Sequence, residues 1–398
     1  MRCDSFCAAG GGMGIIVAMR IEDTHPTLAA ARRLDATVRA HAAETTSARC
    51  LAAPLVDAFV EAGFYRMLIP KAVGGEEVPP QVFVSVLEAL GKADGSAAWC
   101  VMVGATTGLV AALLPEDAAR EVFPKDVVPS GVFAPIGTAS VEPGGLRVSG
   151  RWPFASGSER ATVRLAGVVV KEEGQAPRVS HVLVAPKDMH VVDTWRTAGL
   201  RGTGSHDMVA ESVFVPDART LSLFGAKPRH GGPLYAFPFF GLLSLGIAAV
   251  AMGVASAALD AFAELAAKKT PGGSKRALNQ RETVHLRFAE ATAALGAARA
   301  FVAVAVADAE AEARAEGAVS VPKRATLRLA AANAVRASAA AVDLVYGAAG
   351  GSSIYADHPL QRQFQDVHVA TQHMMVAEPV WTLAGRVMLG VESDTSQL

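Results

Sequence analysis

The chain has 398 residues, 51% of them hydrophobic, which is enough for two or three packed units with substantial cores. Its 37 Lys and Arg residues are balanced by 38 Asp and Glu residues, and no basic run stands out. Because affinity for nucleic acid depends on concentrated positive charge, this balance argues against a nucleic-acid-binding protein.

The four cysteines show no metal-ligand spacing. Cys3, Cys7, Cys50 and Cys100 form no CxxC pair, and no histidine stands at the spacing of a zinc ligand. This pattern is typical of a reducing compartment and of a protein without structural metal, so we expect a cytoplasmic location and no metal site. Residues 1–23 lack a typical signal peptide and are predicted to be a loose N-terminal extension.

Residues 24–128 are predicted to form an N-terminal helical domain. Apolar residues recur at intervals of three and four over 26–51 and 79–114, with charged residues between them. The stretch 95–115 is apolar almost throughout, and we predict a buried helix there rather than a membrane span.

Residues 129–230 are predicted to form a β domain. They contain short β-branched runs separated by turn residues, and "EPGG" at 142–145 indicates a hairpin. Over 231–398 the helical period returns and predicts four long helices, the first of which is uncharged over 231–259 and is expected to be buried. No alternation of strands and helices suggests a nicotinamide-binding sheet.

Two stretches combine small and hydroxyl residues in a way that suits a ligand. "GRWPFASGSERA", residues 150–161, places an aromatic cluster beside Ser156, Gly157 and Ser158, a surface that suits a planar heteroaromatic with polar edges. The alternative is a hairpin corner with a core tryptophan. "TAGLRGTGSHDM", residues 197–208, is either a Gly-rich connection or a source of ligand contacts. Its available side chains are Arg201, Thr203, Ser205 and His206.

"QDVHVATQHMMVAEP", residues 365–379, contains two of the ten histidines. On an α-helix five residues advance about 500°, so His368 and His373 would lie about 140° apart and could not share a face. They are therefore a poor metal pair. Asp366 would share a face with His373, whereas His368 is expected to have a packing or subunit-contact role.

Four ordered stretches resemble the acyl-CoA dehydrogenase superfamily over about residues 24–390. They are "DGSAAWCVMVGATTG", "GRWPFASGSERA", "WRTAGLRGTGSHDMVAESVFVP" and "AAGGSSIYADHPLQRQFQDVHVATQH". More narrowly, the chain resembles the oxygenase components of two-component flavin-dependent monooxygenases, such as those of hydroxyphenylacetate, a steroid phenol and dibenzothiophene. The resemblance implies an α+β, mainly helical fold with an N-terminal helical domain, a central β-barrel and a C-terminal four-helix bundle. It also implies a homotetramer, with flavin between one subunit and the bundle of a neighbour.

The resemblance assigns catalytic roles to His373, beside the flavin C4a and able to change protonation near neutral pH, and to Ser156, near the flavin N5. The other implied cofactor contacts are Trp152, Gly157, Ser158, Arg276, Gly350, Gly351 and Met374. Arg281 is a second candidate for the flavin phosphate. The expected substrate pocket contains Trp99, Thr106, Phe154 and His206.

The residue at position 374 separates two functions of this superfamily. A dehydrogenase needs a carboxylate base, and its usual glutamate position falls near Met374, which cannot take a proton. We therefore expect an oxygenase that forms a C4a-hydroperoxyflavin from O₂ and reduced FMN or FAD. A separate NAD(P)H flavin reductase is expected to supply the reduced flavin. An acyl-CoA dehydrogenase with a displaced base is the alternative, and a scaffold that binds no flavin is the third.

The expected substrate is a small aromatic or polycyclic compound. Phenol-hydroxylating relatives tend to carry a histidine after the "SAAW" stretch, but residues 100–109 here contain none. The usual base for a phenol is therefore missing here. This leaves an N- or S-containing compound, or a carbon acid activated otherwise, as the substrate, with His206 as a substitute base if the substrate is a phenol.

Overall fold

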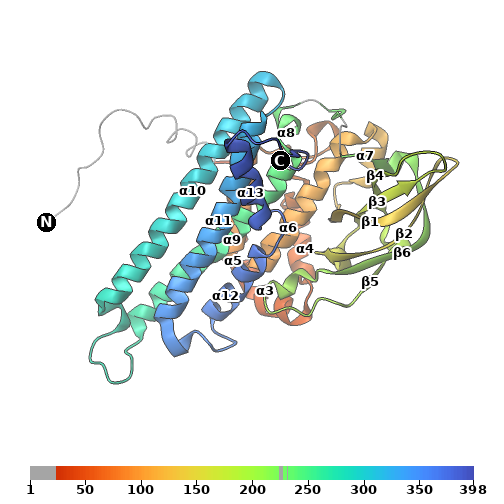
Figure 1. Ribbon diagram of the computed structural model, residues 1–398. Helices are drawn as coiled ribbons and strands as arrows, with labels where there is room; N and C mark the ends of the chain where they lie inside the picture. Colours follow the sequence, from red (N-terminus) through yellow and green to blue (C-terminus); the bar gives the residue numbers. More distant parts are fainter. Residues whose placement is uncertain (1–23, 224–226, 231) are drawn as a thin grey trace.

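The computed structural model describes residues 24–223, 227–230 and 232–398, and the predicted extension at 1–23 lies outside them. The described chain begins with short helices, continues into one β-sheet and ends in long helices, as Figure 1 shows. The predicted order of a helical domain, a β domain and a helical bundle is confirmed.

The N-terminal helices start at residues that suit a first turn. They are α2 (Pro26–Arg33), α3 (Asp35–Ala48), α4 (Ala53–Glu61), α5 (Pro80–Ala93), α6 (Gly95–Gly108) and α7 (Glu116–Val122). Proline stands in the first turn of α2, α4 and α5, where its missing N–H costs nothing. Asp94 caps α6 by accepting a 2.8 Å hydrogen bond from the N–H of Ala97. Almost every residue of α6 is buried, because this helix lies between the other N-terminal helices and the sheet.

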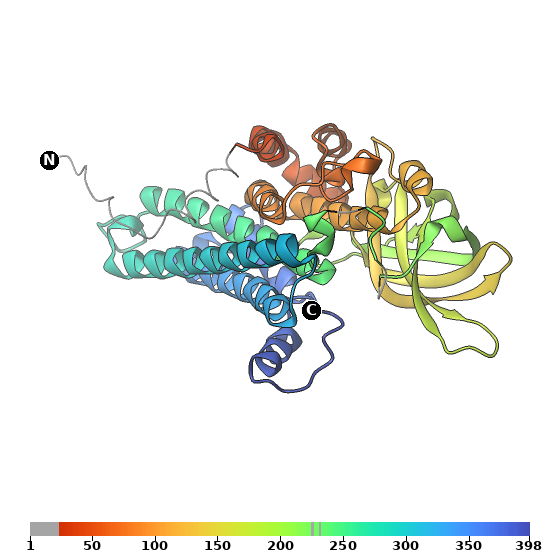
Figure 2. The same cartoon turned by 90° about the horizontal axis from the view of Figure 1, so that it is seen from above.

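Seven strands form one sheet in the order β5-β6-β2-β1-β3-β4-β7, which curves strongly in Figure 2. They are β1 (Pro129–Glu142), β2 (Gly145–Ala155), β3 (Val163–Lys171), β4 (Arg178–Val184), β5 (His190–Val192), β6 (His206–Pro216) and β7 (Thr220–Leu221). The predicted hairpin joins β1 to β2. Strands β1 and β3 are parallel, and the other pairs are antiparallel. The pairings of the described strands leave β5 and β7 as edges, so hydrogen bonds do not close the expected barrel.

The C-terminal part contains α8 (Pro233–Ala236), α9 (Phe239–Lys268), α10 (Glu282–Glu316), α11 (Val321–Ala349), α12 (Pro359–Thr371) and α13 (Glu378–Met388). The last of the four predicted long helices is instead two helices, because the chain turns between α12 and α13. At this turn the carbonyl of His373 accepts from the N–H groups of Val376 and Ala377 at 3.0 and 3.1 Å. Pro379 suits the first turn of a new helix.

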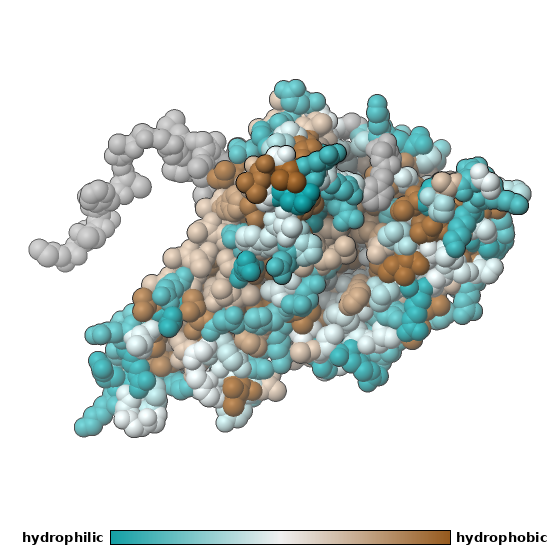
Figure 3. Space-filling view, in the orientation of Figure 1, coloured by the Kyte–Doolittle hydropathy of each residue, from teal (hydrophilic) through white to brown (hydrophobic). Residues whose placement is uncertain are grey.

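Within the described part of the chain, three helical segments are long and apolar enough to cross a membrane by length and composition: Gly95–Leu113, α9 and α10. In the first two, 89% of the most apolar window is buried inside the protein, as predicted for buried helices. In α10 only 33% of that window is buried. Figure 3 shows weakly hydrophobic surface along this side of the bundle. One long face of α10 is thus apolar and not covered by the described chain.

A buried carboxyl group joins the bundle to the connection between β5 and β6. Asp366 of α12 accepts a 2.5 Å hydrogen bond from the N–H of Leu200. Next to it the backbone is in close contact, because a side chain at Gly199 would come within 2.2 Å of the carbonyl oxygen of Gln365. Burial and the neighbouring charge of Asp94 raise the pKa of Asp366 to about 7. Asp366 is therefore largely protonated in the folded protein below neutral pH.

The Asp366→Asn variant should remove a pH dependence of stability. Since the folded-state pKa is raised, the contribution of Asp366 is complete below about pH 4 and is lost as the pH rises through 7. Asparagine still offers an oxygen to Leu200 but does not titrate. Relative to the variant, the free energy of unfolding of the wild type should fall by at most about 4 kcal/mol between pH 4 and 7.5, measured by urea denaturation. Parallel pH profiles for the two proteins would contradict this assignment.

Candidate functional site

Ser156 lies at the junction of α6, β2 and the connection before β6, within a chain of buried hydroxyl groups. Its Oγ accepts a 3.2 Å hydrogen bond from Nε1 of Trp99 in α6. The same oxygen lies 2.6 Å from Oγ of Ser205, which in turn lies 2.7 Å from Oγ1 of Thr203. The Thr203 hydroxyl donates to the carbonyl of Leu200 at 2.8 Å. All four polar side chains are buried, so these hydrogen bonds are shielded from solvent.

An irregular end of β2 directs Ser156 to this position. The register between β2 and β6 shifts between Trp152 and Ala155, and Phe154 adopts a positive φ of 63°. The N–H of Ser156 then bonds to the carbonyl of Phe154 at 2.9 Å. Gly157, with φ of 72°, donates its N–H to the carbonyl of Thr203 at 2.8 Å. This bulge lets the strand end turn towards α6, as bulges next to functional sites do.

His373 lies in the turn after α12, beside the ring of Trp99. The two rings meet edge-on with centroids 5.7 Å apart. The Nδ1 atom of His373 accepts a 3.2 Å hydrogen bond from the N–H of Met375, which places the proton of the neutral ring on Nε2. Nε2 has no hydrogen-bond partner among the described residues. The ring therefore offers an N–H donor beside Trp99.

The charge state of His373 differs from the expectation. Burial, and secondarily the positive charge of Arg328, lower its pKa to about 4. The imidazole is thus neutral at neutral pH, and it does not change protonation there as the sequence suggested. Arg328 of α11 also positions the turn, because its guanidinium donates to the carbonyl of Met375 at 3.2 Å and to the carbonyl of Gln397. Nothing in the sequence singled out Arg328.

His368 faces a different direction, in agreement with its expected packing role. Its Nε2 lies 2.9 Å from Oδ1 of Asp343 in α11, and its ring contacts Phe364 edge-on at 4.5 Å. The two histidines are therefore not a pair, and no group of three or more metal-ligating side chains occurs within the described ranges.

Trp152 and Thr106 do not reach the site. The Trp152 indole is fully buried inside the sheet, and its Nε1 donates to the carbonyl of Gly167 at 2.7 Å. The strand alternation thus directs this side chain to the core of the sheet, and the flavin contact of residue 152 stays a prediction. Thr106 is buried in α6, where its hydroxyl donates to the carbonyl of Met102 at 2.8 Å. Its hydroxyl is therefore satisfied within its own helix rather than offered to a substrate.

His206 organises the loop beside the site. It is buried, and its Nδ1 accepts from the N–H groups of Thr194 and Trp195, both at 3.1 Å. Nδ1 is thus occupied by backbone donors, and the substrate contact of His206 stays a prediction. Phe154 and Met374 are 70% and 61% exposed, so both lie at the surface of a single chain. Phe154 packs edge-on against Trp195, with ring centroids 6.1 Å apart.

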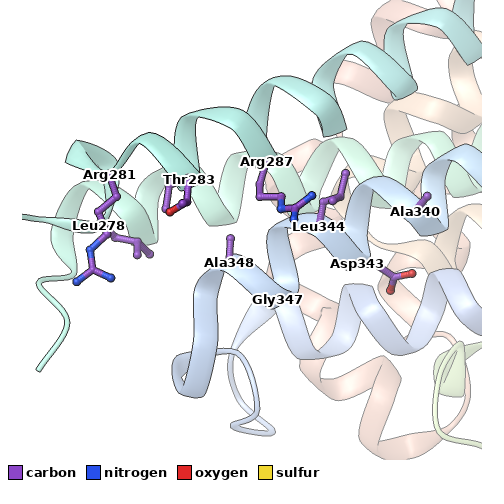
Figure 4. Close-up of a pocket in the computed structure, with 10 residues that line it drawn as sticks. Leu278, Arg281, Thr283, Arg287, Ala340, Asp343, Leu344, Gly347 and Ala348 are labelled. Atoms are coloured by element: carbon purple, nitrogen blue, oxygen red, sulfur yellow. The ribbon is translucent and has the colours of Figure 1, made fainter.

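A hollow of about 700 Å³ lies between α10 and α11 at the end of the bundle formed by the start of α10 (Figure 4). Its lining includes Arg281, Thr283 and Arg287, whereas Arg276 is not among the lining residues. Arg276 is exposed, and its backbone bonds to the Ser274 hydroxyl. Of the two arginines predicted for the flavin phosphate, Arg281 lines this hollow and Arg276 does not.

The predicted glycine pair lies just after α11. Gly350 has φ of 59°, and an added side chain there would have only Nζ of Lys269, 3.9 Å away, within 4 Å. At Gly351 a side chain would have no neighbour. Lys269, which donates to the carbonyl of Ala349 at 2.6 Å, is a cation that the sequence analysis missed. Open backbone beside a cation suits the approach of a phosphate group.

Among the described residues, no carboxylate is hydrogen-bonded to the side chains at the centre of this site. None of the hydrogen bonds recorded for the side chains of Ser156, Trp99 and His373 involves a carboxylate. Met374 stands beside His373 and cannot accept a proton from carbon. What the site offers is a hydroxyl group and a neutral imidazole N–H, both in contact with one indole ring.

Comparison with known proteins identifies the family of the chain. Residues 24–123 match the N-terminal domain of acyl-CoA dehydrogenases, and residues 245–378 match the C-terminal domain. The chain belongs to the acyl-CoA dehydrogenase superfamily and, within it, to the oxygenase components of flavin-dependent monooxygenases.

Three similar proteins define that branch. An indole-3-acetate monooxygenase of Pseudomonas putida is 32% identical over 88% of this chain and 90% of its own length. The oxygenase component of an FADH₂-dependent resorcinol hydroxylase from Rhizobium is 30% identical over 89% and 91%. The crystal structure of a 3-HSA hydroxylase from Rhodococcus sp. RHA1 covers 95% of this chain and 100% of that one, with a TM-score of 0.89 and 28% identity.

The tautomer of His373 can be measured directly. We expect nitrogen chemical shifts of ¹⁵N-histidine-labelled protein to show a neutral ring protonated at Nε2, with a titration midpoint near pH 4. Because the folded-state pKa is depressed, the contribution of the neutral ring to stability should be present above pH 6.5 and lost as the pH falls through 4. The His373→Ala spectrum assigns the signal. A midpoint between pH 6 and 7 would show that the ring is not desolvated as described.

Proposed function

We propose that this chain is the oxygenase component of a two-component flavin-dependent monooxygenase. The observation that carries the proposal is the pairing of an acceptor at Ser156 with a neutral Nε2–H donor at His373 around Trp99. When bound, reduced flavin would supply the electrons that activate O₂ for transfer of one oxygen atom to the substrate.

The chain carries groups that fit a flavin. Ser156 would accept a hydrogen bond from the ring, and His373 would donate through Nε2–H to oxygen bound beside the ring. Trp99 and Ser156 are buried where α6 meets the sheet, and this burial would keep water from the reacting oxygen. Arg281 and the backbone at Gly350 and Gly351 would hold the flavin phosphate.

The alternative of an acyl-CoA dehydrogenase is less well supported. It requires a carboxylate that removes a weakly acidic proton next to the flavin. The groups recorded around the site are hydroxyls, an indole and a neutral imidazole. A neutral imidazole whose pKa is about 4 is a weak base for this step.

The proposed substrate is a small aromatic or polycyclic compound. The similar proteins act, by their names, on indole-3-acetate and resorcinol, and Phe154 with Trp195 offers aromatic surface near the site. In α6 the hydroxyls of Thr106 and Thr107 are both used within the helix, so α6 supplies no base for a phenol. A substrate that reacts without deprotonation by α6 fits this site best.

We further propose that the protein is a homotetramer in the cytoplasm. A separate NAD(P)H flavin reductase would supply its reduced flavin. The exposed apolar face of α10 supports an assembly, because burying it against another copy removes apolar surface from water. The hollow with Arg281 lies at the start of α10, whereas Ser156 lies where α6 meets the sheet. A second copy would bring its own hollow next to Ser156 of the first copy. Free Cys50 and Cys100 are consistent with a reducing compartment.

The primary test is the reaction of protein-bound reduced FMN or FAD with O₂. We expect O₂ uptake to precede the return of oxidised-flavin absorbance, and His373→Ala to shorten this delay about tenfold because the donor is lost. His368→Ala is the matched control, since this histidine packs against α11 and should leave the delay unchanged. Stopped-flow absorbance and an oxygen electrode provide the two readouts.

Two results would contradict the oxygenase proposal. One is simultaneous O₂ uptake and flavin reoxidation in the wild type, as for free flavin. The other is anaerobic bleaching of bound oxidised flavin by an acyl-CoA, which would establish the dehydrogenase instead.

The phosphate ligand can be tested with two arginines of the same segment. We expect Arg281→Ala to weaken the binding of reduced FMN and FAD about tenfold, because a charge-assisted hydrogen bond is lost. Arg276→Ala should change it less than twofold, since Arg276 lies outside the hollow. Anaerobic fluorescence titration measures both affinities, and the opposite ranking would restore the original assignment to Arg276.

Mixed assemblies then test whether the site is shared between copies. Co-expression of Arg281→Ala and His373→Ala chains should restore the delay in part, because some sites would combine Arg281 from one chain with His373 from another. If both residues served a site within one chain, every site would lack one of them and no restoration would occur.

A further inference from the structure

Four polar side chains near Ser156 form a hydrogen-bonded chain whose direction can be assigned by counting protons. A carbonyl oxygen only accepts, so the 2.8 Å contact with the carbonyl of Leu200 takes the single hydroxyl proton of Thr203. The 2.7 Å contact between Thr203 and Ser205 must then use the proton of Ser205. The 2.6 Å contact between Ser205 and Ser156 must in turn use the proton of Ser156.

The opposite direction leaves one contact without a proton. If Thr203 donated to Ser205, its Oγ1 and the carbonyl oxygen of Leu200 would face each other at 2.8 Å with lone pairs only. The Leu200 carbonyl also accepts from Nε1 of Trp195 at 3.0 Å and therefore stays an acceptor. Thr203, Ser205, Ser156 and Leu200 are buried, so the assigned direction, which satisfies every contact, is strongly favoured.

The consequence falls on Ser156. Its proton is committed to Ser205, and one of its lone pairs already receives Nε1–H of Trp99. A hydroxyl oxygen has two lone pairs, so one remains for a ligand. Towards a ligand, Ser156 is thus an acceptor and not a donor.

We propose that Ser205 and Thr203 are positioning residues that make the site selective for reduced over oxidised flavin. This inference rests on the proposed function, in which Ser156 faces N5 of the flavin. N5 carries a proton in reduced flavin and is a bare acceptor in oxidised flavin. A fixed acceptor at Ser156 pairs with the first and opposes the second, so the spent cofactor is released and its reduced form enters.

Reversing the direction of the hydrogen bonds between Thr203, Ser205 and Ser156 tests the inference. Thr203→Val keeps the size of the side chain but removes the oxygen that receives the Ser205 proton. Ser205 would then donate to Ser156, and the Ser156 proton would become free for N5 of oxidised flavin. Thr203→Ser retains the hydroxyl and is the matched control. Ser205→Ala, which also frees the Ser156 proton, serves as a second variant if Thr203→Val does not fold.

The readout is the ratio of the dissociation constants of oxidised and reduced flavin, measured with FMN and with FAD. We expect the wild type to bind the reduced form at least about tenfold more tightly, and Thr203→Val to lower the ratio about tenfold. For a two-electron couple, a tenfold change corresponds to about 30 mV in the midpoint potential of bound flavin. Thr203→Ser should keep the ratio within twofold of the wild type.

The outcomes separate this inference from the proposed function. A ratio near one in the wild type, or a ratio unchanged in Thr203→Val and Ser205→Ala, overturns the inference while the delay in flavin reoxidation still supports an oxygenase. A purely structural effect of Thr203→Val would weaken both affinities equally and leave the ratio unchanged, which also overturns it. If the wild type binds flavin in neither state, both the inference and the proposed function are lost.

Discussion

The hydrogen bond from the N–H of Leu200 to Asp366 is the contact on which the site depends. It joins the last helices of the chain to the connection that carries Thr203 and Ser205, over a sequence separation of 166 residues. A charged carboxyl group is costly to bury. Here burial raises the pKa of Asp366, so that its neutral form is favoured, and the N–H of Leu200 gives it a hydrogen bond. The hydroxyl chain, the bulge at Phe154 and the ring of Trp99 are all arranged around this anchored connection.

Much of the fold could be predicted from the sequence because hydrophobic period and turn residues are local signals. The change from helical to strand period near residue 129 and back after 231 is visible in the sequence. The break between α12 and α13 was missed, because its cause is the combination of Pro379 and a carbonyl cap rather than a glycine-rich turn. The edges of the sheet also depend on long-range pairing that no local pattern encodes.

The site was predictable only in part. The sequence stretches indicated Ser156 and His373, and they listed Thr203 and Ser205 as available to a ligand. Which way a side chain points depends on the strand register and the bulge, so the sequence could not show that the Trp152 side chain faces the core of the sheet. The contributions of Arg328 and Lys269 are tertiary, because each acts on backbone far from it in sequence, and no motif announces them.

The bulge at the end of β2 separates two requirements within a few residues. On one side of it, Trp152 is locked into the sheet core, and on the other Ser156 is locked into the hydroxyl chain. Between them Phe154 projects outward, with its ring largely free of both. A strand end built in this way can change the size and polarity of one projecting side chain without altering the scaffold or the chemistry. A different side chain at residue 154 would therefore leave both of these locked neighbours in place.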